Sequence, residues 1–353
     1  MKRLLIADPV APVTIAADSP TWMVAELSGN HNGSLARALE LVACAKRAGA
    51  DAVKLQTYTA DTITMDAPGE WFVVRGGPWH GRRLHDLYSE ASTPWAWHAD
   101  LFAAARAAGL ACFSTPFDPT SVDFLETLDC PVYKVASFEV VDLPLLERIG
   151  ATRKPVIMST GMATLAEIDA ALATLRRSGC AGVALLNCVS SYPAPAAEMH
   201  LANLAPLAER GDAPAGLSDH TLGQTVAIAA VSLGARLIEK HLCLRRADGG
   251  PDAGFSLEPE EFASLVRAVR ETESAIGVAP RFGPGQAEAG SLAFRKSLFF
   301  ARDLPAGHVV TRDDIRVIRP GHGLPPAALS EVVGRGTRAA IARGTPVAWS
   351  LLT

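Results

Sequence analysis

Residues 35–57, LARALELVACAKRAGADAVKLQT, contain one full unit of the pattern that decides the fold. Leu35–Ala48 places apolar residues at helical spacing, Gly49 is suited to end that helix, and Ala52–Leu55 is a short apolar run that predicts a buried strand. An alanine- and leucine-rich helix that leads through a glycine into an apolar strand is typical of proteins with a parallel sheet.

The same pattern recurs from Trp22 to about Ile276. Apolar runs predict eight strands, at Met23–Leu27, Ala52–Leu55, Ala111–Phe113, Val132–Val135, Val156–Met158, Val183–Leu186, Ala215–Leu217 and Leu237–Ile238. Helical spacing predicts eight helices, at Leu35–Ala48, Pro94–Ala108, Thr120–Leu128, Leu143–Ile149, Leu165–Arg177, Met199–Ala208, Gly223–Leu233 and Pro259–Ile276. Eight such units over about 255 residues predict an α/β fold, a (β/α)8 TIM barrel.

The pattern changes after Gly277, where closely spaced prolines and glycines predict a linker. We expect a barrel domain over residues 1–277, a linker over 278–290 and a small β-rich domain over 291–353. Short strands are expected in that last domain at Ser297–Phe300, Val309–Val310, Ile315–Ile318, Ala339–Ile341 and Val347–Leu351. At the other end, Met1–Ala7 is too short an apolar run for a signal peptide and predicts a first strand or hairpin.

Composition excludes several classes of partner. The chain has 33 Lys and Arg against 37 Asp and Glu, a net charge of −4, which argues against a protein that binds nucleic acid or an anionic membrane. It contains no run of about 20 apolar residues such as a membrane span requires. Six cysteines without a Cys-x-x-Cys pair predict reduced thiols and a cytoplasmic location.

A long stretch, Thr59–Thr93, separates the second predicted strand from its helix, and we call it the inserted segment. It holds Trp71, Trp79 and the charged run His80–Asp86. A loop of this length on a barrel is typically functional, and it would lie on the catalytic face. Four tryptophans in and after this stretch are interpreted as core or lid packing, namely Trp71, Trp79, Trp95 and Trp97.

Polar residues follow all eight predicted strands, at the end of a barrel where active sites lie. Lys54 and Lys134 would both point into the enclosed mouth, where an unpaired ammonium is costly, so we expect an anion between them. The surrounding hydroxyls are typical of a phosphate or carboxylate site, and they are Ser114, Thr115, Ser137, Ser159, Thr160, Ser190 and Ser218. The alternative for Lys134 is a nucleophile that forms a Schiff base.

His220 and His241 end neighbouring strands, and a strand spacing of about 4.8 Å lets both imidazoles meet one divalent ion. The alternative is that each is merely hydrogen-bonded within the barrel. Glu26 is a candidate to orient a hydroxyl, to transfer a proton or to neutralise Lys54. Three further carboxylates are candidates to hydrogen-bond the metal ligands or a sugar, namely Asp219, Glu239 and Asp252.

These residues lie in segments that resemble those of the sialic acid synthase family, whose members have a phosphoenolpyruvate-condensing (β/α)8 barrel followed by an antifreeze-like (SAF, β-clip) domain. The matching segments cover nearly the whole chain, in the order Ala25–Gly33, Ala50–Thr57, Ser114–Asp118, Tyr133–Ser137, Ser159–Met162, Gly216–Thr221, Glu239–His241 and Ile318–Gly323. Within this family, Gly77–Trp97 most resembles the pseudaminic acid synthase branch.

The resemblance implies a transferase that condenses phosphoenolpyruvate with an open-chain N-acetylated sugar and water, releasing phosphate and a nine-carbon 2-keto acid. It implies that Glu26 assists proton transfer, and that His220 and His241 bind Mn²⁺ or Mg²⁺, which polarises the sugar aldehyde. The implied phosphoenolpyruvate site consists of Lys54, Thr115, Lys134, Ser137, Ser159, Ser190 and Ser218. The implied sugar site consists of Gln56, Tyr192, Glu239, Asp252 and Arg319.

Arg319 belongs to the second domain, and the resemblance implies that it reaches the active site of a partner subunit, hence a homodimer. The chain departs from the family at Asn187–Val189 and at Ser190, where some members have asparagine, so phosphate contacts from this strand are less firmly implied. N-acetylneuraminate and legionaminic acid synthases are the enzymatic alternatives. A carbohydrate-binding protein without catalysis is the alternative from another class, although such a protein would not need all of these lysines and histidines.

Overall fold

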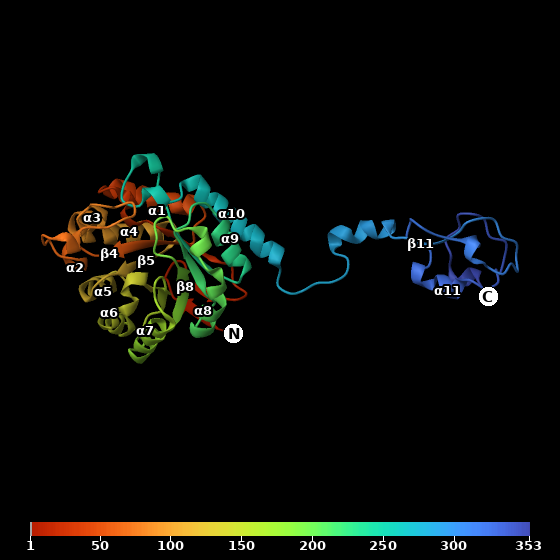
Figure 1. Ribbon diagram of the computed structural model, residues 1–353, viewed down its shortest axis with the longest axis horizontal. Helices are drawn as coiled ribbons and strands as arrows, with labels where there is room; N and C mark the ends of the chain where they lie inside the picture. The colour runs from red at the N-terminus through yellow and green to blue at the C-terminus, as the bar shows by residue number, and fades with distance from the viewer. Residues whose placement is uncertain (1) are drawn as a thin grey trace. The chain divides into compact units, whose positions relative to one another are not determined.

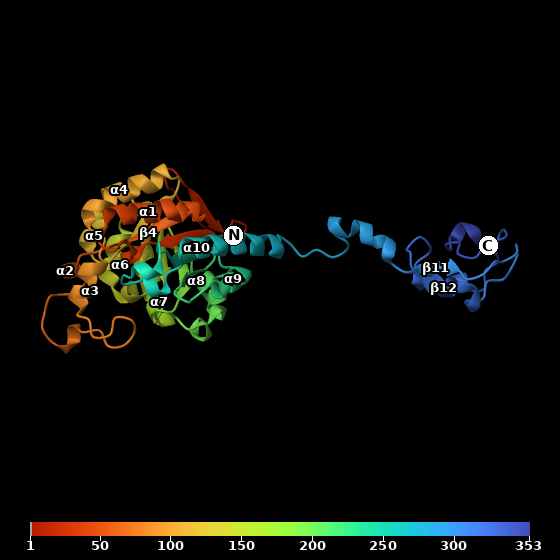
Figure 2. The ribbon, with the colours of Figure 1, turned by 90° about the horizontal axis from the view of Figure 1, so that it is seen from above.

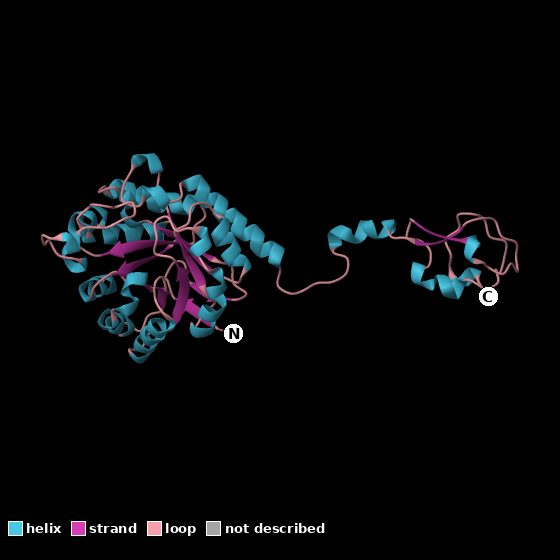
Figure 3. Ribbon diagram, in the orientation of Figure 1, coloured by secondary structure: helices cyan, strands magenta, loops and turns pink. Residues whose placement is uncertain are grey.

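Eight parallel strands close into a barrel at the centre of the first part of the chain (Figures 1 and 3). The computed structural model describes residues 2–353. In order around the barrel the strands are β10 (Leu237–His241), β3 (Trp22–Glu26), β4 (Ala52–Thr57), β5 (Ala111–Pro116), β6 (Tyr133–Val135), β7 (Val156–Ser159), β8 (Val183–Cys188) and β9 (Gly216–Asp219). All of them are almost entirely buried, as the apolar runs predict. The predicted TIM barrel is therefore confirmed.

Several strands extend past their apolar runs into the polar residues that follow. β4 continues to Thr57 and β10 to His241, so that Gln56 and His241 are held by parallel pairing rather than by a loop. Strand geometry turns alternate side chains to opposite faces. As a result, Glu239 and His241 share one face of β10 and Lys240 takes the other.

Helices cover the outside of the barrel (Figure 1). They are α1 (Leu35–Arg47), α4 (Trp95–Ala107), α5 (Pro119–Glu126), α6 (Leu143–Gly150), α7 (Leu165–Arg177), α8 (Leu204–Arg210), α9 (Thr225–Ser232) and α10 (Pro259–Ile276). Gly49 and Gly109 follow α1 and α4 with φ of +86° and +68°, the left-handed conformation that ends a helix at low cost for glycine.

One helix begins later than its apolar pattern predicts. Within the expected helix Met199–Ala208, a 3₁₀ turn at Leu201–Asn203 precedes α8, which begins only at Leu204. His200 has a positive φ of +42°, and the Asn187 side chain donates a 2.6 Å hydrogen bond to the Met199 carbonyl, which is thereby taken out of helical pairing. A local polar contact overrides the apolar spacing at this point.

The chain begins with the antiparallel hairpin of β1 (Arg3–Ile6) and β2 (Val13–Ala16), as predicted. Leu4, Ile6 and Ile15 are buried in the same hydrophobic core as the barrel. No helix within residues 2–353 is both long and apolar enough to span a membrane.

The inserted segment forms α2 (Ala60–Ile63), a 3₁₀ turn at Glu70–Phe72 and α3 (Leu84–Ala91). Figure 2 shows it in orange, with loops that project from the barrel. The end of the inserted segment packs closely against the barrel, because a Cβ atom added at Gly29 would lie 3.2 Å from the Cα of Ala91. The end of α3 is therefore pressed against the turn that follows β3.

Contacts within the chain divide it between Val278 and Ala279 into two compact units. The second unit has its own buried core and contains β11 (Ser297–Phe300), β12 (Ile315–Ile318) and the short helix α11 (Leu329–Val332). The prediction of three further strands there is wrong. Val309, Ile341 and Leu352 take part only in isolated bridges, and Trp349–Leu351 is a 3₁₀ turn, because turns leave these runs too short for a ladder.

Candidate functional site

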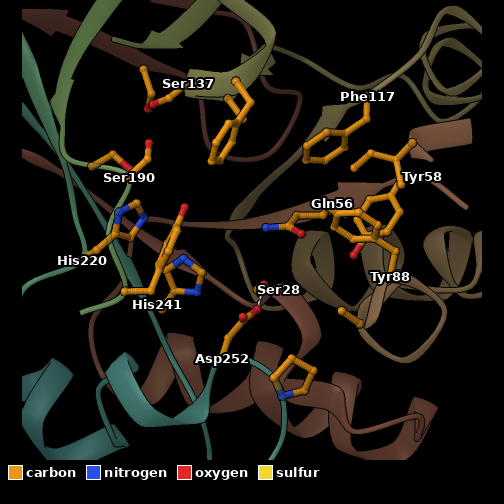
Figure 4. A pocket seen from close by; sticks show the side chains of 18 of the residues that line it. Ser28, Gln56, Tyr58, Tyr88, Phe117, Ser137, Ser190, His220, His241 and Asp252 are labelled. Carbon is orange, nitrogen blue, oxygen red and sulfur yellow. Dashed lines mark hydrogen bonds between the residues drawn. The ribbon is translucent and has the colours of Figure 1, made fainter. Parts of the chain in front are cut away.

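A pocket with a volume of about 450 Å³ opens at the carboxyl ends of the barrel strands (Figure 4). It brings together twelve of the predicted site residues, which are Lys54, Gln56, Lys134, Ser137, Ser159, Ser190, Tyr192, Ser218, His220, Glu239, His241 and Asp252. The parallel register explains this convergence, because it places the ends of all eight strands at the same rim.

Three buried charged side chains, Lys54, Lys134 and Glu239, form the floor of the pocket. The Lys54 ammonium forms an ion pair with Glu26, lies 3.7 Å from Glu239 Oε1 and donates to Thr115 Oγ1 at 3.1 Å. Lys134 Nζ lies 3.8 Å from the same Glu239 oxygen. Glu26 and Thr115 do not line the pocket, and instead support Lys54 from behind. Two buried cations therefore share one central carboxylate.

Burial raises the pKa of Glu26 to about 7 even though Lys54 opposes that shift. Burial also acts on Glu239, but there Lys134 and Lys54 outweigh it and hold the carboxyl pKa below its ordinary value. Near neutral pH, Glu239 is thus ionised while Glu26 is partly protonated. Burial lowers the pKa of Lys134, whereas Glu239 and Glu26 outweigh burial at Lys54 and raise its pKa. Two lysines beside one fully ionised glutamate favour an anion at the floor.

Hydroxyl groups surround Lys134. The Lys134 ammonium donates to Ser159 Oγ at 2.7 Å and to the Val135 carbonyl at 3.1 Å. A Cβ atom at Gly161 would lie 2.7 Å from Ser190 Oγ and 2.9 Å from Ser137 Oγ, so glycine is needed for these two serines to approach. The result is a cradle of hydroxyls around one ammonium.

Two other hydroxyls of the predicted anion site lie elsewhere, and that part of the prediction is wrong. Ser114 is 2.6 Å from Thr57 Oγ1, which also contacts His98 at 2.9 Å, and the Thr160 hydroxyl donates to the Leu186 carbonyl at 2.9 Å. Ser114 lies on the opposite face of β5 from Thr115, since neighbouring residues of a strand point to opposite faces.

Several buried polar atoms around the pocket have no hydrogen-bond partner among the described residues. They are Ser190 Oγ, Glu239 Oε2, Glu139 Oε2 and His241 Nδ1. Unsatisfied buried polar atoms are costly and are usually paired in folded proteins. Their concentration here is what a site for a polar ligand requires.

His220 and His241 lie side by side at the pocket wall, with ring centroids 5.4 Å apart (Figure 4). His220 Nδ1 is 3.0 Å from the Val189 carbonyl, which leaves Nε2 toward the pocket. Burial, together with the neighbouring His220 and lysines, holds the pKa of His241 well below its ordinary value, so this ring is neutral. A neutral His241 beside a His220 whose Nδ1 is held by a backbone carbonyl fits a divalent ion.

No group of three or more His, Cys, Asp or Glu side chains within residues 2–353 is arranged to hold a metal. In that part of the chain, His220 and His241 alone offer two imidazole nitrogens at the pocket wall. Structural metal sites usually have four protein ligands, so such a pair suits a catalytic rather than a structural metal.

Aromatic side chains line the pocket beside the two histidines. Tyr192 lies 4.5 Å from the His220 ring and 5.0 Å from Phe255, measured between centroids. Trp79 from the inserted segment packs 5.3 Å from Tyr192, and its indole donates to the Pro251 carbonyl at 2.8 Å. The inserted segment is thereby joined to the loop after β10.

The other tryptophans lie outside the pocket. Trp95 stacks on Phe124, Trp97 contacts His31, and Trp71 is 89% exposed, so the interpretation of Trp71 as packing is wrong. Among them, only Trp79 contributes to the pocket wall.

Two predicted carboxylates take different positions. Asp252 reaches the pocket, where the Ser28 hydroxyl donates to it (Figure 4). Asp219 points away from the pocket and forms a fully buried ion pair with Lys240, at 2.7 Å, while also accepting from the Thr221 amide. It anchors the turn that carries His220.

Arg319 belongs to the second unit and is the residue that directly follows β12.

Sequence reasoning assigned no role to several residues that line the pocket, among them Glu139, Cys188 and Phe255. Burial raises the pKa of Glu139 to about 7. Glu139 follows strand β6 by four residues, so its place at a strand end was the available signal. Phe255 lies in the loop after β10, where no sequence pattern distinguishes it.

The model of the NeuB family matches residues 41–280, and the model of the SAF domain matches residues 295–353. The chain belongs to the NeuB family. The pseudaminic acid synthase of Helicobacter pylori is 40% identical over 329 residues, which cover 93% of this chain and 96% of that protein. The N,N'-diacetyllegionaminic acid synthase of Legionella pneumophila is 34% identical, covering 93% of each.

The solved structure of N-acetylneuraminic acid synthetase from Leptospira borgpetersenii, in complex with citrate, is also similar to this NeuB family chain. It superposes with a TM-score of 0.72 at 27% identity, covering 82% of this chain and 96% of that one. The two sequence matches, which cover 93% of the chain, extend over both units. The chain is therefore an enzyme, a transferase of this synthase family.

Proposed function

We propose that this enzyme is a pseudaminic acid synthase, which condenses phosphoenolpyruvate with 2,4-diacetamido-2,4,6-trideoxy-L-altrose and water to give pseudaminic acid and phosphate. The observation that carries the proposal is the pocket floor, where two buried lysines and a cradle of hydroxyls meet two histidines. The identity of 38–40% to three pseudaminic acid synthases, against 34% and below for the relatives of other branches, supports the choice of sugar.

Phosphoenolpyruvate carries a carboxylate and a phosphate, and the floor offers a cation to each. Lys54 and Lys134 bind these groups with help from Ser137, Ser159, Ser190 and Ser218, while Thr115 positions Lys54. The hydroxyls can satisfy oxygens that the lysines do not reach, and Ser190 Oγ has no other buried partner among the described residues. Holding both anionic groups orients the enol carbon toward the histidines.

His220 and His241 would hold a divalent cation, Mn²⁺ or Mg²⁺, which when bound polarises the sugar aldehyde as a Lewis acid. The sugar lies along the rest of the pocket, where Gln56, Tyr192, Glu239 and Asp252 offer polar atoms. The enol carbon of phosphoenolpyruvate forms a bond to the aldehyde carbon, and cationic character develops at the neighbouring carbon. Water adds there, and phosphate then leaves with its bridging oxygen.

Glu26 supplies a carboxyl poised to exchange protons during these steps. Burial brings its pKa to about 7, the range in which a carboxyl acts as either acid or base near neutrality. Because Glu26 lies behind Lys54 and forms an ion pair with it, the protonation state of Glu26 decides how far the Lys54 charge is neutralised on the substrate side.

A phosphate-release assay with a panel of sugars tests the proposal. The purified protein with phosphoenolpyruvate and Mn²⁺ is expected to release phosphate with 2,4-diacetamido-2,4,6-trideoxy-L-altrose, to stop when the metal is chelated and to resume when it is returned. Release with N-acetylmannosamine, or with the diacetamido mannose analogue, but not with the altrose sugar would reject this branch in favour of the N-acetylneuraminate or legionaminic acid branch.

We also infer that the enzyme is a homodimer in which Arg319 completes the partner's sugar site. Apolar side chains are exposed around the barrel rim, at Phe138, Val141, Met162 and Leu165, where they are suited to be covered by another chain. The amide of an acetamido group is a suitable acceptor for Arg319.

Mixing two inactive variants tests this arrangement. Arg319→Ala and Lys134→Met are each expected to lose most activity, the first mainly by raising the sugar KM. The two purified variants are mixed under native conditions, so that their subunits exchange while the chains stay folded. If Arg319 acts in the partner's site, mixed dimers contain one site with both defects and one intact site, and activity returns. If the mixture stays as inactive as its components while exchange is demonstrated, Arg319 does not act across the dimer.

A further inference from the structure

The two ends of the pocket differ in chemistry. Figure 4 places His220 and His241 at one end and the rings of Tyr58, Tyr88 and Phe117 at the other, with Gln56 between them. The rings of the second end form a compact group, since Tyr58 is 5.7 Å from Tyr88 and 5.1 Å from Phe117 between centroids. The charged floor and the metal ligands belong to the first end.

Helix α3 of the inserted segment borders the second end with one apolar face. Its pocket-lining residues are spaced at i, i+3, i+4 and i+7, and they are Leu84, Leu87, Tyr88 and Ala91. The opposite face of the helix carries His85, Asp86, Ser89 and Glu90. Helix α2 packs against α3 and adds Ile63 to the pocket wall.

This wall offers few hydrogen bonds. Leu84, Leu87 and Ile63 have no polar side-chain atom, and the polar groups nearby are the two phenols and Gln56. A hydroxyl placed against the leucines would lose its hydrogen bonds to water without replacement, which is unfavourable, whereas a methyl group would gain by burial.

An open-chain sugar whose aldehyde lies at the histidines extends its last carbon away from them, toward this wall. We propose that the α3 face formed by Leu84 and Leu87 reads the far end of the sugar and selects a methyl group there over a hydroxymethyl group. The inference rests on the proposed function, because the sugar proposed for this enzyme is deoxygenated at its sixth carbon, whereas N-acetylmannosamine is not.

The inserted segment is therefore a specificity element. The phosphoenolpyruvate site is built from other parts of the chain, since Lys54, Lys134 and the serines all come from barrel strands or the turns after them. Its substitution should change the choice of sugar while leaving the handling of phosphoenolpyruvate intact.

Leu84→Asn tests this inference, because asparagine has nearly the shape of leucine and brings hydrogen-bonding atoms to a half-buried position. The control is Ser89→Asn, which places the same residue on the exposed face of the same helix. For each protein, kcat/KM is measured with the 2,4-diacetamido-2,4,6-trideoxy sugar and with its 6-hydroxy counterpart of the same configuration.

The unsubstituted enzyme is expected to prefer the 6-deoxy sugar by roughly 10- to 100-fold, the range that apolar pockets achieve. Leu84→Asn is expected to reduce that ratio at least about fivefold with the phosphoenolpyruvate KM unchanged, and Ser89→Asn to preserve it. An unchanged ratio in Leu84→Asn, or no preference in the unsubstituted enzyme, overturns the inference. Absence of phosphate release with both diacetamido sugars, but release with N-acetylmannosamine, overturns the proposed function as well.

Discussion

The two ends of the pocket are built in different ways. At the histidine end, most polar side chains come from the strands of a closed barrel or from the turns that directly follow them. At the aromatic end, much of the wall comes from the inserted segment, whose α2 and α3 pack on one another. Helix α3 contacts the barrel through Tyr58, which in turn packs on Phe117, and through the turn after β3. From this difference we infer that the barrel positions the reacting groups, whereas the inserted segment decides which sugar fits beside them.

Electrostatics follow the same division. Two lysines, two glutamates and two histidines are buried at the first end, where low exposure strengthens their interactions. The α3 face at the second end is neutral and contributes through contact area. Substitutions at the first end should therefore affect turnover, and substitutions at the second end should affect selectivity.

The largest expected effect is at the barrel end. Lys134→Met leaves Glu239 without one of its two cations and removes the ammonium at the centre of the serine cradle. Loss of one strong electrostatic contact of this kind lowers kcat/KM by roughly 10²- to 10³-fold. Steady-state phosphate release measures it.

The matched control for that substitution is Lys154→Met, at a lysine that pairs with Glu126 outside the pocket. It is expected to retain nearly full activity, because such a half-exposed pair contributes little. If both variants lose activity equally, the effect of Lys134→Met is not specific to the site.

A smaller effect is expected at Gly161, which belongs to the same end. In Gly161→Ala the new methyl group would lie 2.7 Å from Ser190 Oγ and must push the two serines apart. Loss of about one hydrogen bond, or ~1.4 kcal/mol, should raise the phosphoenolpyruvate KM roughly tenfold and leave the ratio between sugars unchanged.

Gly254→Ala is the control, because a Cβ atom there meets nothing within 4 Å. A change in sugar selectivity with Gly161→Ala, rather than in phosphoenolpyruvate KM, would contradict the division between the two ends.

The smallest effect on catalysis is expected at the junction of the two regions, where buried His31 and His98 affect stability instead. Burial lowers the pKa of each to about 4 from 6.5. The unfolded chain therefore binds more protons between these values, and stability is lost as the pH falls from about 6.5 toward 4, by about 3 kcal/mol for each histidine.

Denaturant unfolding at several pH values measures this dependence. In His98→Gln, the loss of unfolding free energy at low pH is expected to be smaller by the contribution of one histidine. The glutamine keeps an amide that can contact Thr57. A decline of the same steepness in this variant would mean that His98 is not among the groups that titrate.

The barrel end could be predicted from the sequence because strand order and strand ends determine it. Lys54, Lys134, His220 and His241 each follow or end an apolar run, and the closure of the barrel brings them together. Ser114 was misplaced because a shift of one residue along a strand moves a side chain to the other face.

The aromatic end could be predicted only in outline. The length of the inserted segment and its tryptophans indicated a functional loop, yet which side chains face the pocket depends on how α3 docks against Tyr58 and the turn after β3. Such docking is a tertiary contact between distant segments. For the same reason, Phe255 and Trp79 meet over the histidines without any local signal.

A competition assay tests the central claim most directly. The unsubstituted enzyme is given phosphoenolpyruvate, Mn²⁺ and equal concentrations of 2,4-diacetamido-2,4,6-trideoxy-L-altrose and N-acetylmannosamine, and the products are quantified by mass spectrometry. Pseudaminic acid is expected to be the dominant product, with one phosphate released for each molecule formed. Dominance of N-acetylneuraminate would contradict both the proposed substrate and the role of the inserted segment.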